Sequence, residues 1–556
     1  MPVCKVCGAP VSENDNVCPY CGSDLPKVIK TTQVPNDNKV EELPSISSGN
    51  ENEKKLGSFC DVNWKQLINK KGKTGIILGD TRRLTDKDQF YDAVKRFIEA
   101  RFKDVKYDFL DLGTEKVCGN IEPTIENLLM LLEKIYDVSV PKYLLIIGDW
   151  SVIPAIKWRD EADHEGGVVP SDLPYITFNT ASPWSGKKFD FKDAVMIGRI
   201  PTTVMTNFKE AITYLDNAGK FKPTNIINGF AYSAHEWKLT SANVFFGLTE
   251  MLNISPKMVC KPIEGFPDGT ILQKLNGYNL LGFNLHGASW SHYWYGQYGN
   301  FMPEAFMASL LPDGKEGYMM CTEACYGARP TVDAKNVDSI VVQALTHNCM
   351  AFVGSSVTAY GQAYGQMVCA DVIANVFLKS VREGLTAGES FNLALSALCK
   401  KRMSETEIKT LAEFALYGDP SIALYKDNAI QKVAFNDYQA KICRPLDDET
   451  LARKLVPFNE QVGFYGRTGD DYVAVSFDPQ ANHEIKQVAH MISKKSKDFI
   501  TSKFSELKDE TPIMYKVFGM DEYRSNYVKK NENGILETIS LHLDKEGNVI
   551  EVYFSK

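Results

Sequence analysis

The sequence predicts an α/β protein with a mostly parallel sheet and flanking helices, preceded and followed by smaller parts. From residue 60 onward, short apolar segments of strand length alternate with amphipathic segments of helix length. Strands that alternate with helices pair in parallel and carry helices on both faces of the sheet. The chain has 556 residues, too many for one hydrophobic core, so we expect about three or four domains.

The predicted sheet divides into two halves, residues 60–220 and residues 221–430. In the first half the expected strands are 74–80, 142–149 and 193–201, and the expected helices are 87–102, 124–136 and 206–218. In the second half the expected strands are 226–234, 349–356 and two that end near residues 286 and 325; the expected helices are 242–252, 366–382 and 390–404, and the segment 414–421 closes the half.

The composition excludes several classes of protein. With 44% hydrophobic and 24% charged residues it is that of a soluble globular protein, and the net charge of −8 argues against a nucleic-acid-binding function. The first residues carry no apolar secretory region, and no apolar stretch reaches about 18 residues, so we expect neither a secretory signal nor a membrane span. Thirteen cysteines in such a chain are expected to be reduced thiols, metal ligands or a catalyst. The expected location is cytoplasmic.

Two CxxC pairs near the N-terminus, with ten residues between them, predict a zinc site. Four thiolates in a tetrahedral arrangement select Zn²⁺ and leave no position for substrate, so this zinc would be structural. Residues 1–25 are therefore predicted to form a zinc ribbon, and the polar residues 26–59 a flexible linker. The predicted ligands are Cys4, Cys7, Cys18 and Cys21.

Two apolar segments in the second half each end in a reactive side chain and a glycine. One ends at His286 and Gly287, and the other at Cys325, which Tyr326 and Gly327 follow. The 39 positions from His286 to Cys325 are enough for a helix and a loop to bring the second strand beside the first. A thiol beside an imidazole is the arrangement of a cysteine nucleophile with its acid/base partner, so these strand ends indicate a peptidase.

Inert burial is the alternative for Cys325, because cysteine is often part of a hydrophobic core. Cys321 lies inside the same apolar segment, and Cys349 and Cys369 also lie in apolar surroundings, so all three are predicted core residues. His292, in an aromatic loop, competes with His286 but lacks the position at a strand end. The residues alone leave both interpretations of Cys325 open.

A series of short motifs is spread in a fixed order over residues 70–427. They are residues 144–149 with Ile153 and Pro154, Ser171 and Asp172 with Tyr175, residues 197–199, Ser233 and Ala234, His286 and Gly287, Ala324 and Cys325, and residues 417–420. None is specific alone, but the collinear set resembles the gingipain-type cysteine peptidases, the C25 family, which share a caspase-like fold. The resemblance covers the greater part of the chain.

The resemblance implies roles for four residues. Cys325 would be the nucleophile, and His286 would stand near the scissile bond and protonate the leaving amine. Gly287 would let its backbone amide approach the oxyanion, with the amide of Cys325 as second donor. The family places an acidic residue after the Ser-Ala motif, so Glu236 is the candidate for orienting His286, although His235 lies at or beside that position. A solvated loop carboxylate is the alternative for Glu236.

The resemblance also indicates where substrate would bind. Arginine-specific members carry an acidic residue shortly after the Ser-Ala loop, whereas this sequence has no carboxylate from residue 237 until Glu250, which argues against arginine preference. A packed surface loop is the alternative for the aromatic loop around Trp290. The expected pocket walls and cleft cover are Ser355, Ser356, Tyr360, Tyr364 and Trp290.

Residues 431–556 are predicted to form a connector, 431–456, and a small C-terminal α+β domain. Its expected elements are strands 472–477 and 513–518, a helix at 482–507, and a hairpin of strands 540–543 and 549–554. Secreted gingipain relatives carry an all-β immunoglobulin-like domain at this place, so the chain departs from them here.

These observations predict an intracellular cysteine endopeptidase that acts on polypeptides. We expect it to be latent until activated, because a permanently active cytoplasmic protease would be hazardous. The zinc ribbon is the candidate for binding a protein partner. The alternative is an inactive caspase-like scaffold that binds peptides, or binds partners through the ribbon; the intact His-Gly and Ala-Cys pairs argue against it. No nucleic-acid or membrane partner is expected.

Overall fold

The computed structural model describes two stretches of the chain, residues 75–425 and residues 462–555, both with gaps. The described segments are 75–114, 122–160, 167–178, 191, 194–245, 258–259, 270–297, 301–313, 316–330, 339–363, 367–399, 403–425, 462–468, 471–475, 492, 494–504, 507–510, 512–517, 522–530 and 536–555. The predicted zinc ligands Cys4, Cys7, Cys18 and Cys21, the predicted pocket residue Tyr364 and the predicted connector lie outside these segments.

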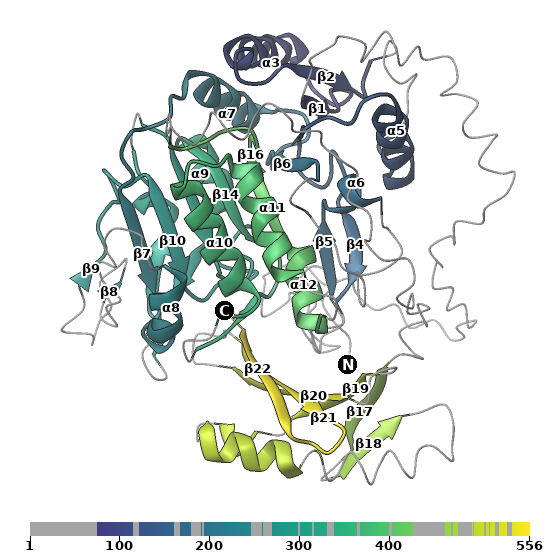
Figure 1. Cartoon of the computed structure of the whole chain (residues 1–556), viewed down its shortest axis with the longest axis vertical. Coiled ribbons are helices and arrows are strands. Elements are labelled where there is room, and N and C mark those ends of the chain that lie inside the picture. Colours follow the sequence, from purple (N-terminus) through teal and green to yellow (C-terminus); the bar gives the residue numbers. More distant parts are fainter. Residues whose placement is uncertain are drawn as a thin grey trace, which may run out of the picture. The chain divides into compact units, whose positions relative to one another are not determined.

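Nine of the described strands form one sheet, in the order β2–β1–β3–β6–β16–β14–β13–β10–β7 (Figure 1). Every neighbouring pair is parallel except β14 and β16. The predicted α/β class and the mostly parallel sheet are therefore confirmed. In chain order the strands are β1 (Gly75–Gly79), β2 (Tyr107–Asp111), β3 (Tyr143–Ile147), β6 (Met196–Ile200), β7 (Gly229–Ser233), β10 (Leu280–Asn284), β13 (Tyr318–Thr322), β14 (Cys349–Ser355) and β16 (Phe414–Gly418).

The single antiparallel pair reverses the direction of half the sheet. Because β16 runs against β14, the strands β14, β13, β10 and β7 point one way and the other five point the opposite way. The carboxyl ends of β10, β13 and β14 therefore share one edge, and those of β1, β2, β3 and β6 share the other. The two blocks differ from the predicted halves at one strand, because β16, which belongs by sequence to residues 221–430, runs parallel to the strands of residues 60–220.

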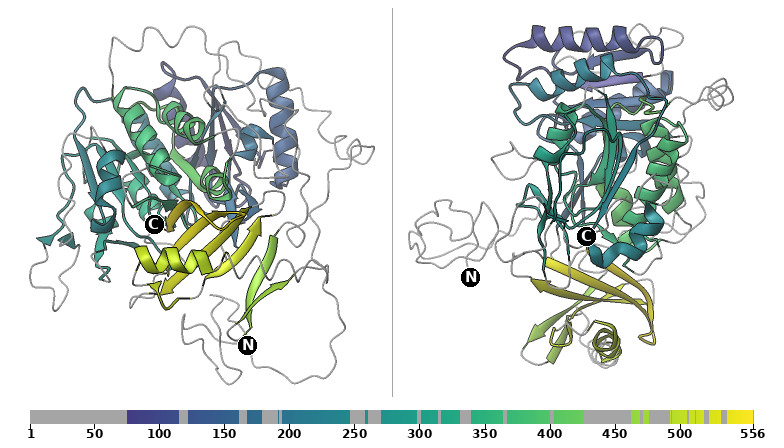
Figure 2. Two further views of the ribbon diagram at one scale, coloured as in Figure 1. Left: turned by 60° about the horizontal axis from the view of Figure 1, so that its bottom comes forward. Right: turned by 90° about the vertical axis from the view of Figure 1, so that its left-hand side faces the viewer.

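Helices cover both faces of this sheet (Figure 2), which explains why central strands such as β3 and β14 are apolar and fully buried. Helix α3 illustrates how the sequence produces them: Phe90, Ala93, Val94 and Phe97 form one buried face, and the side chain of Asp86 caps the N-terminus. The main helices are α3 (Lys87–Arg101), α5 (Ile125–Val138), α7 (Lys209–Lys220), α8 (Lys238–Val244), α9 (Ile340–Thr346), α10 (Ala370–Arg382), α11 (Ala387–Leu398) and α12 (Glu405–Glu413).

Two helices differ from the expectation. Helix α8 begins at Lys238, before the expected start at residue 242, because it continues directly from the 3-10 turn η2 (His235–Trp237). Helix α12 was not predicted. It begins with a capping box, in which Ser404 and Glu407 each bond the backbone amide of the other.

Several motifs of the family resemblance meet at Arg199 on β6. Its guanidinium donates to both carboxylate oxygens of Asp172, at 2.7 and 2.6 Å. It also donates to the carbonyl oxygens of Gly148 and Ile153, at 2.6 and 2.9 Å. Arg199 is completely buried, and a buried charge is tolerated only when it is paired in this way. These motifs therefore hold the first half of the sheet together.

The motif at residues 417–420 joins the two halves. The Tyr107 hydroxyl donates to the carboxylate of Asp419 at 2.6 Å, and the Asp419 amide donates to the Tyr214 hydroxyl at 2.6 Å. Gly418 has a φ of +106°, and a Cβ there would lie 2.4 Å from the carbonyl oxygen of Met350 on β14. Glycine is required where the chain turns this tightly against a neighbouring strand.

The C-terminal residues form a second, antiparallel sheet, in the order β15–β22–β21–β20–β19–β17–β18 among the described strands. The predicted hairpin is confirmed as β21 and β22. Residues 494–503 are helical, within the predicted helix, whereas β17 and β20 were not predicted. The strands are β15 (Tyr360–Gly361), β17 (Val462–Thr468), β18 (Asp471–Val475), β19 (Ile513–Val517), β20 (Glu522–Lys530), β21 (Leu536–Asp544) and β22 (Val549–Ser555).

The second sheet is attached directly to the large sheet, because its edge strand β15 follows β14. Tyr360 pairs with Ser555 of β22. Buried Arg524 on β20 lies 3.5 Å from a carboxylate oxygen of Glu405 and donates to the Thr406 hydroxyl, both in the first turn of α12. The Tyr553 hydroxyl donates to Ser404 at 2.8 Å.

Candidate active site

The ends of β10 and β13 bring His286, Gly287 and Cys325 to one edge of the large sheet. The two strands are adjacent and parallel, with Phe283 opposite Thr322. The chain segments remain in contact as they leave the sheet: a Cβ on Gly287 would lie 1.8 Å from the carbonyl oxygen of Cys325. No side chain fits into that contact, so glycine at position 287 is what allows the two predicted strand ends to meet.

The turn that follows Cys325 is strained. Tyr326 has a φ of +54°, a left-handed conformation that bulky residues rarely adopt and that costs about 1–3 kcal/mol. Hydrogen bonds hold the turn: the Tyr326 amide donates to the Val357 carbonyl at 2.8 Å, and the Gly327 amide donates to the Ala324 carbonyl at 2.9 Å. Strain of this kind concentrates at active sites, where surrounding structure enforces a required geometry.

The surroundings of Cys325 differ from those of the other cysteines nearby. Cys325 is 5% exposed, and its Sγ lies 3.5 Å from the carbonyl oxygen of Ala359. Cys321 is fully buried within β13, and this burial, with the nearby charge of Glu323, raises the pKa of its thiol well above the ordinary value. Burial likewise raises the thiol pKa of Cys349 and Cys369. These three are core thiols, as the sequence predicts.

The imidazole of His286 is packed from two sides. Its Nε2 lies 2.9 Å from Oε1 of Gln297, and its ring centroid lies 4.2 Å from that of Trp237 on η2. The backbone of His286 exchanges two hydrogen bonds of 2.8 Å with Tyr295 of β11 (Tyr293–Tyr295). Neither Gln297 nor Trp237 was predicted to contact His286, since no local pattern reveals that the loop of Gln297 and the turn η2 approach this ring.

The other residues of this region lie as follows. Glu236, the predicted orienting carboxylate, is exposed on η2 beside Trp237. His235 lies on the same turn, within 3.3 Å of the Lys238 ammonium. The ring of the competing His292 packs against that of Tyr293 in a tilted arrangement, with the ring centroids 4.2 Å apart. The role of Glu236 stays a prediction.

The residues expected to bind substrate fall into two groups. Ser355 and Ser356 are buried. The Ser355 hydroxyl donates to the carbonyl oxygen of Val357 at 2.9 Å, and the Ser356 hydroxyl donates to that of Pro170 at 3.5 Å, so both hydroxyls bind nearby backbone. Tyr360 is also buried, within β15. Trp290 is 48% exposed, and its part in covering a bound peptide stays a prediction.

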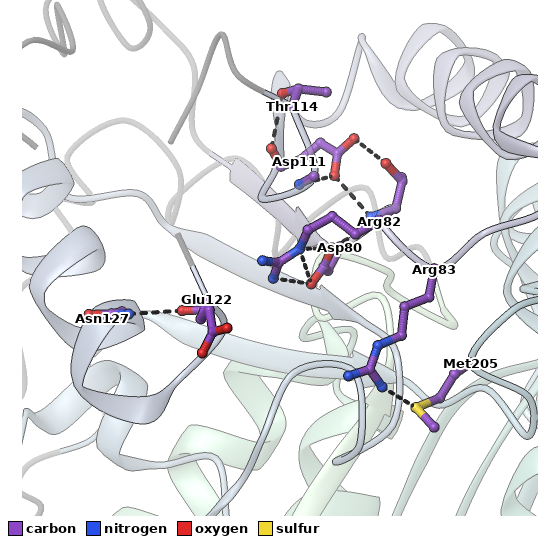
Figure 3. Close-up of polar contacts among 10 residues, drawn as sticks. Asp80, Arg82, Arg83, Asp111, Thr114, Glu122, Asn127 and Met205 are labelled. Carbon is purple, nitrogen blue, oxygen red and sulfur yellow. Dashed lines mark hydrogen bonds and ion pairs between the residues drawn. The ribbon is translucent and has the colours of Figure 1, made fainter. Parts of the chain in front are cut away.

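Charged groups at the opposite edge of the sheet pair with one another (Figure 3). Asp80, after β1, receives hydrogen bonds of 2.9 and 3.1 Å from Nε of Arg82. Asp111, at the end of β2, accepts from the amide and hydroxyl of Thr81, at 3.0 and 2.7 Å, and from the amide of Gly113 at 2.8 Å. This network closes the loops of the first half, and Cys325 and His286 lie at the other edge of the sheet.

Among the described residues, no three His, Cys, Asp or Glu side chains are grouped as metal ligands would be. No helix that the structure describes has the length and apolarity needed to cross a bilayer.

The chain was compared with known families and proteins. Residues 3–25 match a zinc-ribbon domain. Among solved structures, the chain is similar to the Arg-specific cysteine proteinase gingipain R (RgpB), with 16% identity and a TM-score of 0.42 over 64% of this chain and 79% of that one. It is also similar to a complex of the RgpB pro- and mature domains from Porphyromonas gingivalis, with 12% identity and a TM-score of 0.42 over 86% and 99% of the chains. No curated protein matches. Residues 76–425, which include His286, Gly287 and Cys325, match peptidase family C25, and the chain belongs to that family.

Proposed function

We propose that this member of a peptidase family is a cysteine endopeptidase, with Cys325 as the nucleophile and His286 as the proton donor. The observation that supports this most strongly is the contact between Gly287 and the carbonyl oxygen of Cys325, since it joins the two reactive strand ends. The strained turn at Tyr326 adds support, because it presents the thiol of Cys325 at the end of a buried strand.

The geometry suits the steps of peptide hydrolysis. The Cys325 thiolate attacks the carbonyl carbon, and negative charge develops on the carbonyl oxygen. Gly287 would supply one backbone amide to that oxygen; within the described part of the chain, no acceptor takes a hydrogen bond from this amide. The carbon–nitrogen bond breaks as His286 protonates the amine, and water then hydrolyses the thioester and frees the thiol.

Labelling with a peptidyl acyloxymethyl ketone tests the assignment. We expect the intact chain to be labelled, Cys325→Ala to lose labelling, and Cys321→Ala to keep it, because Cys321 is buried and stays protonated. Labelling that survives in Cys325→Ala would refute the nucleophile. An unlabelled chain that still binds peptides would indicate a scaffold instead.

We further propose that the peptidase is latent and that it works in a reducing, cytoplasmic compartment. Cys325 and His286 are only 5% and 3% exposed, which supports a resting state that admits a polypeptide only after a rearrangement. The described cysteines form no disulfide with one another, which suits a reducing compartment. Full activity of the isolated chain, with no cleavage detected by mass spectrometry, would contradict latency.

For the cleavage site we propose a preference other than arginine. Helix α8, which follows the Ser-Ala motif, contains no carboxylate to receive a guanidinium. A peptide library that varies the residue before the cut tests this, and a dominant preference for arginine would contradict it.

We propose that the N-terminal ribbon binds one structural Zn²⁺ and contributes a surface for a protein partner. The donor set fits the metal, because four thiolates in two CxxC pairs match a closed tetrahedral site. The ligands would be Cys4, Cys7, Cys18 and Cys21. Zinc analysis of the chain, compared with a variant in which Cys4 and Cys18 are replaced by serine, tests this.

A further inference from the structure

The side chain of His286 has a specific polar neighbour that the family resemblance does not supply. Oε1 of Gln297 lies 2.9 Å from Nε2 of His286. The indole of Trp237 packs against the imidazole, with the ring planes at 59°. His286 itself is 3% exposed, so little solvent competes for this hydrogen bond.

The backbone around Gln297 is fixed from three directions. Tyr295 exchanges two hydrogen bonds of 2.8 Å with His286, and the Gly296 amide donates to the Pro303 carbonyl at 2.9 Å. The carbonyl of Gln297 accepts from the amide of His235 at 3.1 Å. The Gln297 amide group therefore extends towards the imidazole from a loop whose backbone is constrained by hydrogen bonds.

We infer that Gln297 is the positioning residue of His286: its amide oxygen accepts the Nε2 proton and holds the ring in one orientation. The inference rests on the proposed peptidase function, which it deepens. With Nε2 bound to Gln297, the proton that reaches the leaving amine comes from Nδ1. Gln297 does not touch substrate in this arrangement and acts only through His286.

An uncharged acceptor has a chemical consequence. An amide oxygen orients an imidazolium, but it stabilises the positive charge less than a carboxylate would. The side chain of glutamate has the same length, so Gln297→Glu keeps the acceptor and adds a negative charge. This change raises the pKa of His286, whereas Gln297→Ala removes the acceptor and lowers it.

Other titratable groups around His286 remain the same in all of these variants. They lie on the elements packed around the ring and in the adjacent loops, so they affect each variant and the parent equally. These groups are Cys325 and Glu323 after β13, His235 and Glu236 on η2, Lys238 on α8, and His292 before β11.

The test compares full-length parent, Gln297→Glu and Gln297→Ala, with Gln89→Glu as the matched control on an exposed position of α3. Two quantities are measured: the pH profile of kcat/KM on the best library peptide, and the titration of the His286 imidazole by NMR. We expect Gln297→Glu to move the alkaline limb and the His286 titration upward by about one pH unit. We expect Gln297→Ala to lower kcat/KM about tenfold and to move both downward. Gln89→Glu should change neither.

Coincident pH profiles and titrations in all four proteins would overturn the inference, even with normal peptidase activity. Loss of activity in both Gln297 variants without a shift of the titration would also overturn it, because Gln297 would then be only structural. If the chain has no peptidase activity but the His286 titration moves as expected, the proposed function fails while the contact between Gln297 and His286 is supported.

Discussion

Replacing Gly287 by alanine probes the contact on which the catalytic assignment depends. The added Cβ would lie 1.8 Å from the carbonyl oxygen of Cys325, and the nearest carbon of that carbonyl is 3.0 Å away. Both atoms are backbone, so no flexible side chain can move aside. Ordinary contact begins at 3.4 Å, so the two strand ends must separate by about 1.6 Å.

A separation of this size affects activity more than stability. A displacement of about 1 Å in a catalytic group costs about 100-fold in rate, so we expect kcat/KM and the rate of ketone labelling to fall at least about 100-fold. Overpacking of one methyl group costs about 1–3 kcal/mol, which a domain of this size can tolerate. The folded chain should therefore persist with an inactive site.

The matched control is Gly167→Ala. A Cβ at Gly167 meets no atom within 4 Å, so this variant should keep both activity and stability. Labelling rate, peptide hydrolysis and urea unfolding are measured on both variants and the parent. If Gly287→Ala labels and cleaves within threefold of the parent, the strand ends are not held together by this contact, and the argument for the site is wrong.

Three further predictions concern buried thiols, paired arginines and the zinc ribbon. Burial raises the pKa of the Cys321 and Cys349 thiols above the ordinary 9.0, so as the pH rises these thiols ionise in the unfolded chain before they ionise in the folded one. Above about pH 9 each thiol should therefore lower the free energy of unfolding by about 1.4 kcal/mol per pH unit, which urea unfolding between pH 8 and 10 would measure. Arg524→Ala should cost about 3–5 kcal/mol, because its partners on α12 are left buried, whereas Arg96→Ala, which breaks an exposed pair, should cost less than about 1 kcal/mol; equal costs in urea unfolding would contradict this. A chelator should release about one zinc per chain without changing the unfolding of the peptidase body, as followed by a colorimetric zinc assay and calorimetry.

Most strands of the large sheet were predicted because they are continuous apolar runs, such as β3 and β14, which helices bury on both faces. Strand β2 was missed, since Asp108 and Asp111 interrupt its apolar residues. The direction of β16 was also not predictable, since an apolar run has the same pattern whichever way it points. Strand β20 was also missed, because arginine, serine and asparagine separate its two tyrosines. These polar residues are buried by contacts from elsewhere in the chain, such as those of Arg524 with the first turn of α12 and of Ser525 with Ser496. Helix α12 was missed because its buried face includes Lys409 and Glu413.

The position of His286 and Cys325 at one edge of the sheet was predictable for a related reason. A reactive side chain that directly follows an apolar run, such as His286 or Cys325, must lie at a sheet edge, whatever path the loops take. Gln297 lies on a loop, and its approach to His286 depends on hydrogen bonds with Tyr295, Pro303 and His235 that no local pattern encodes. The sequence therefore locates side chains that directly follow a strand, such as His286 and Cys325, whereas side chains on loops, such as Gln297, are located only by the structure.

Ala359 and Tyr360, which form the wall beside Cys325, connect this cysteine to the C-terminal sheet. Ala359 offers its carbonyl oxygen to the thiol at 3.5 Å, and the next residue, Tyr360, pairs with Ser555 of β22. The same β22 is held to α12 through the Tyr553 hydroxyl, and α12 leads directly into β16 of the large sheet. A shift of β22 must therefore move either β15 or α12, because β22 is joined to β15 by strand pairing and to α12 by the buried hydroxyl of Tyr553. The C-terminal sheet is thus a structural part of the wall beside Cys325 and cannot be treated as a separate appendage.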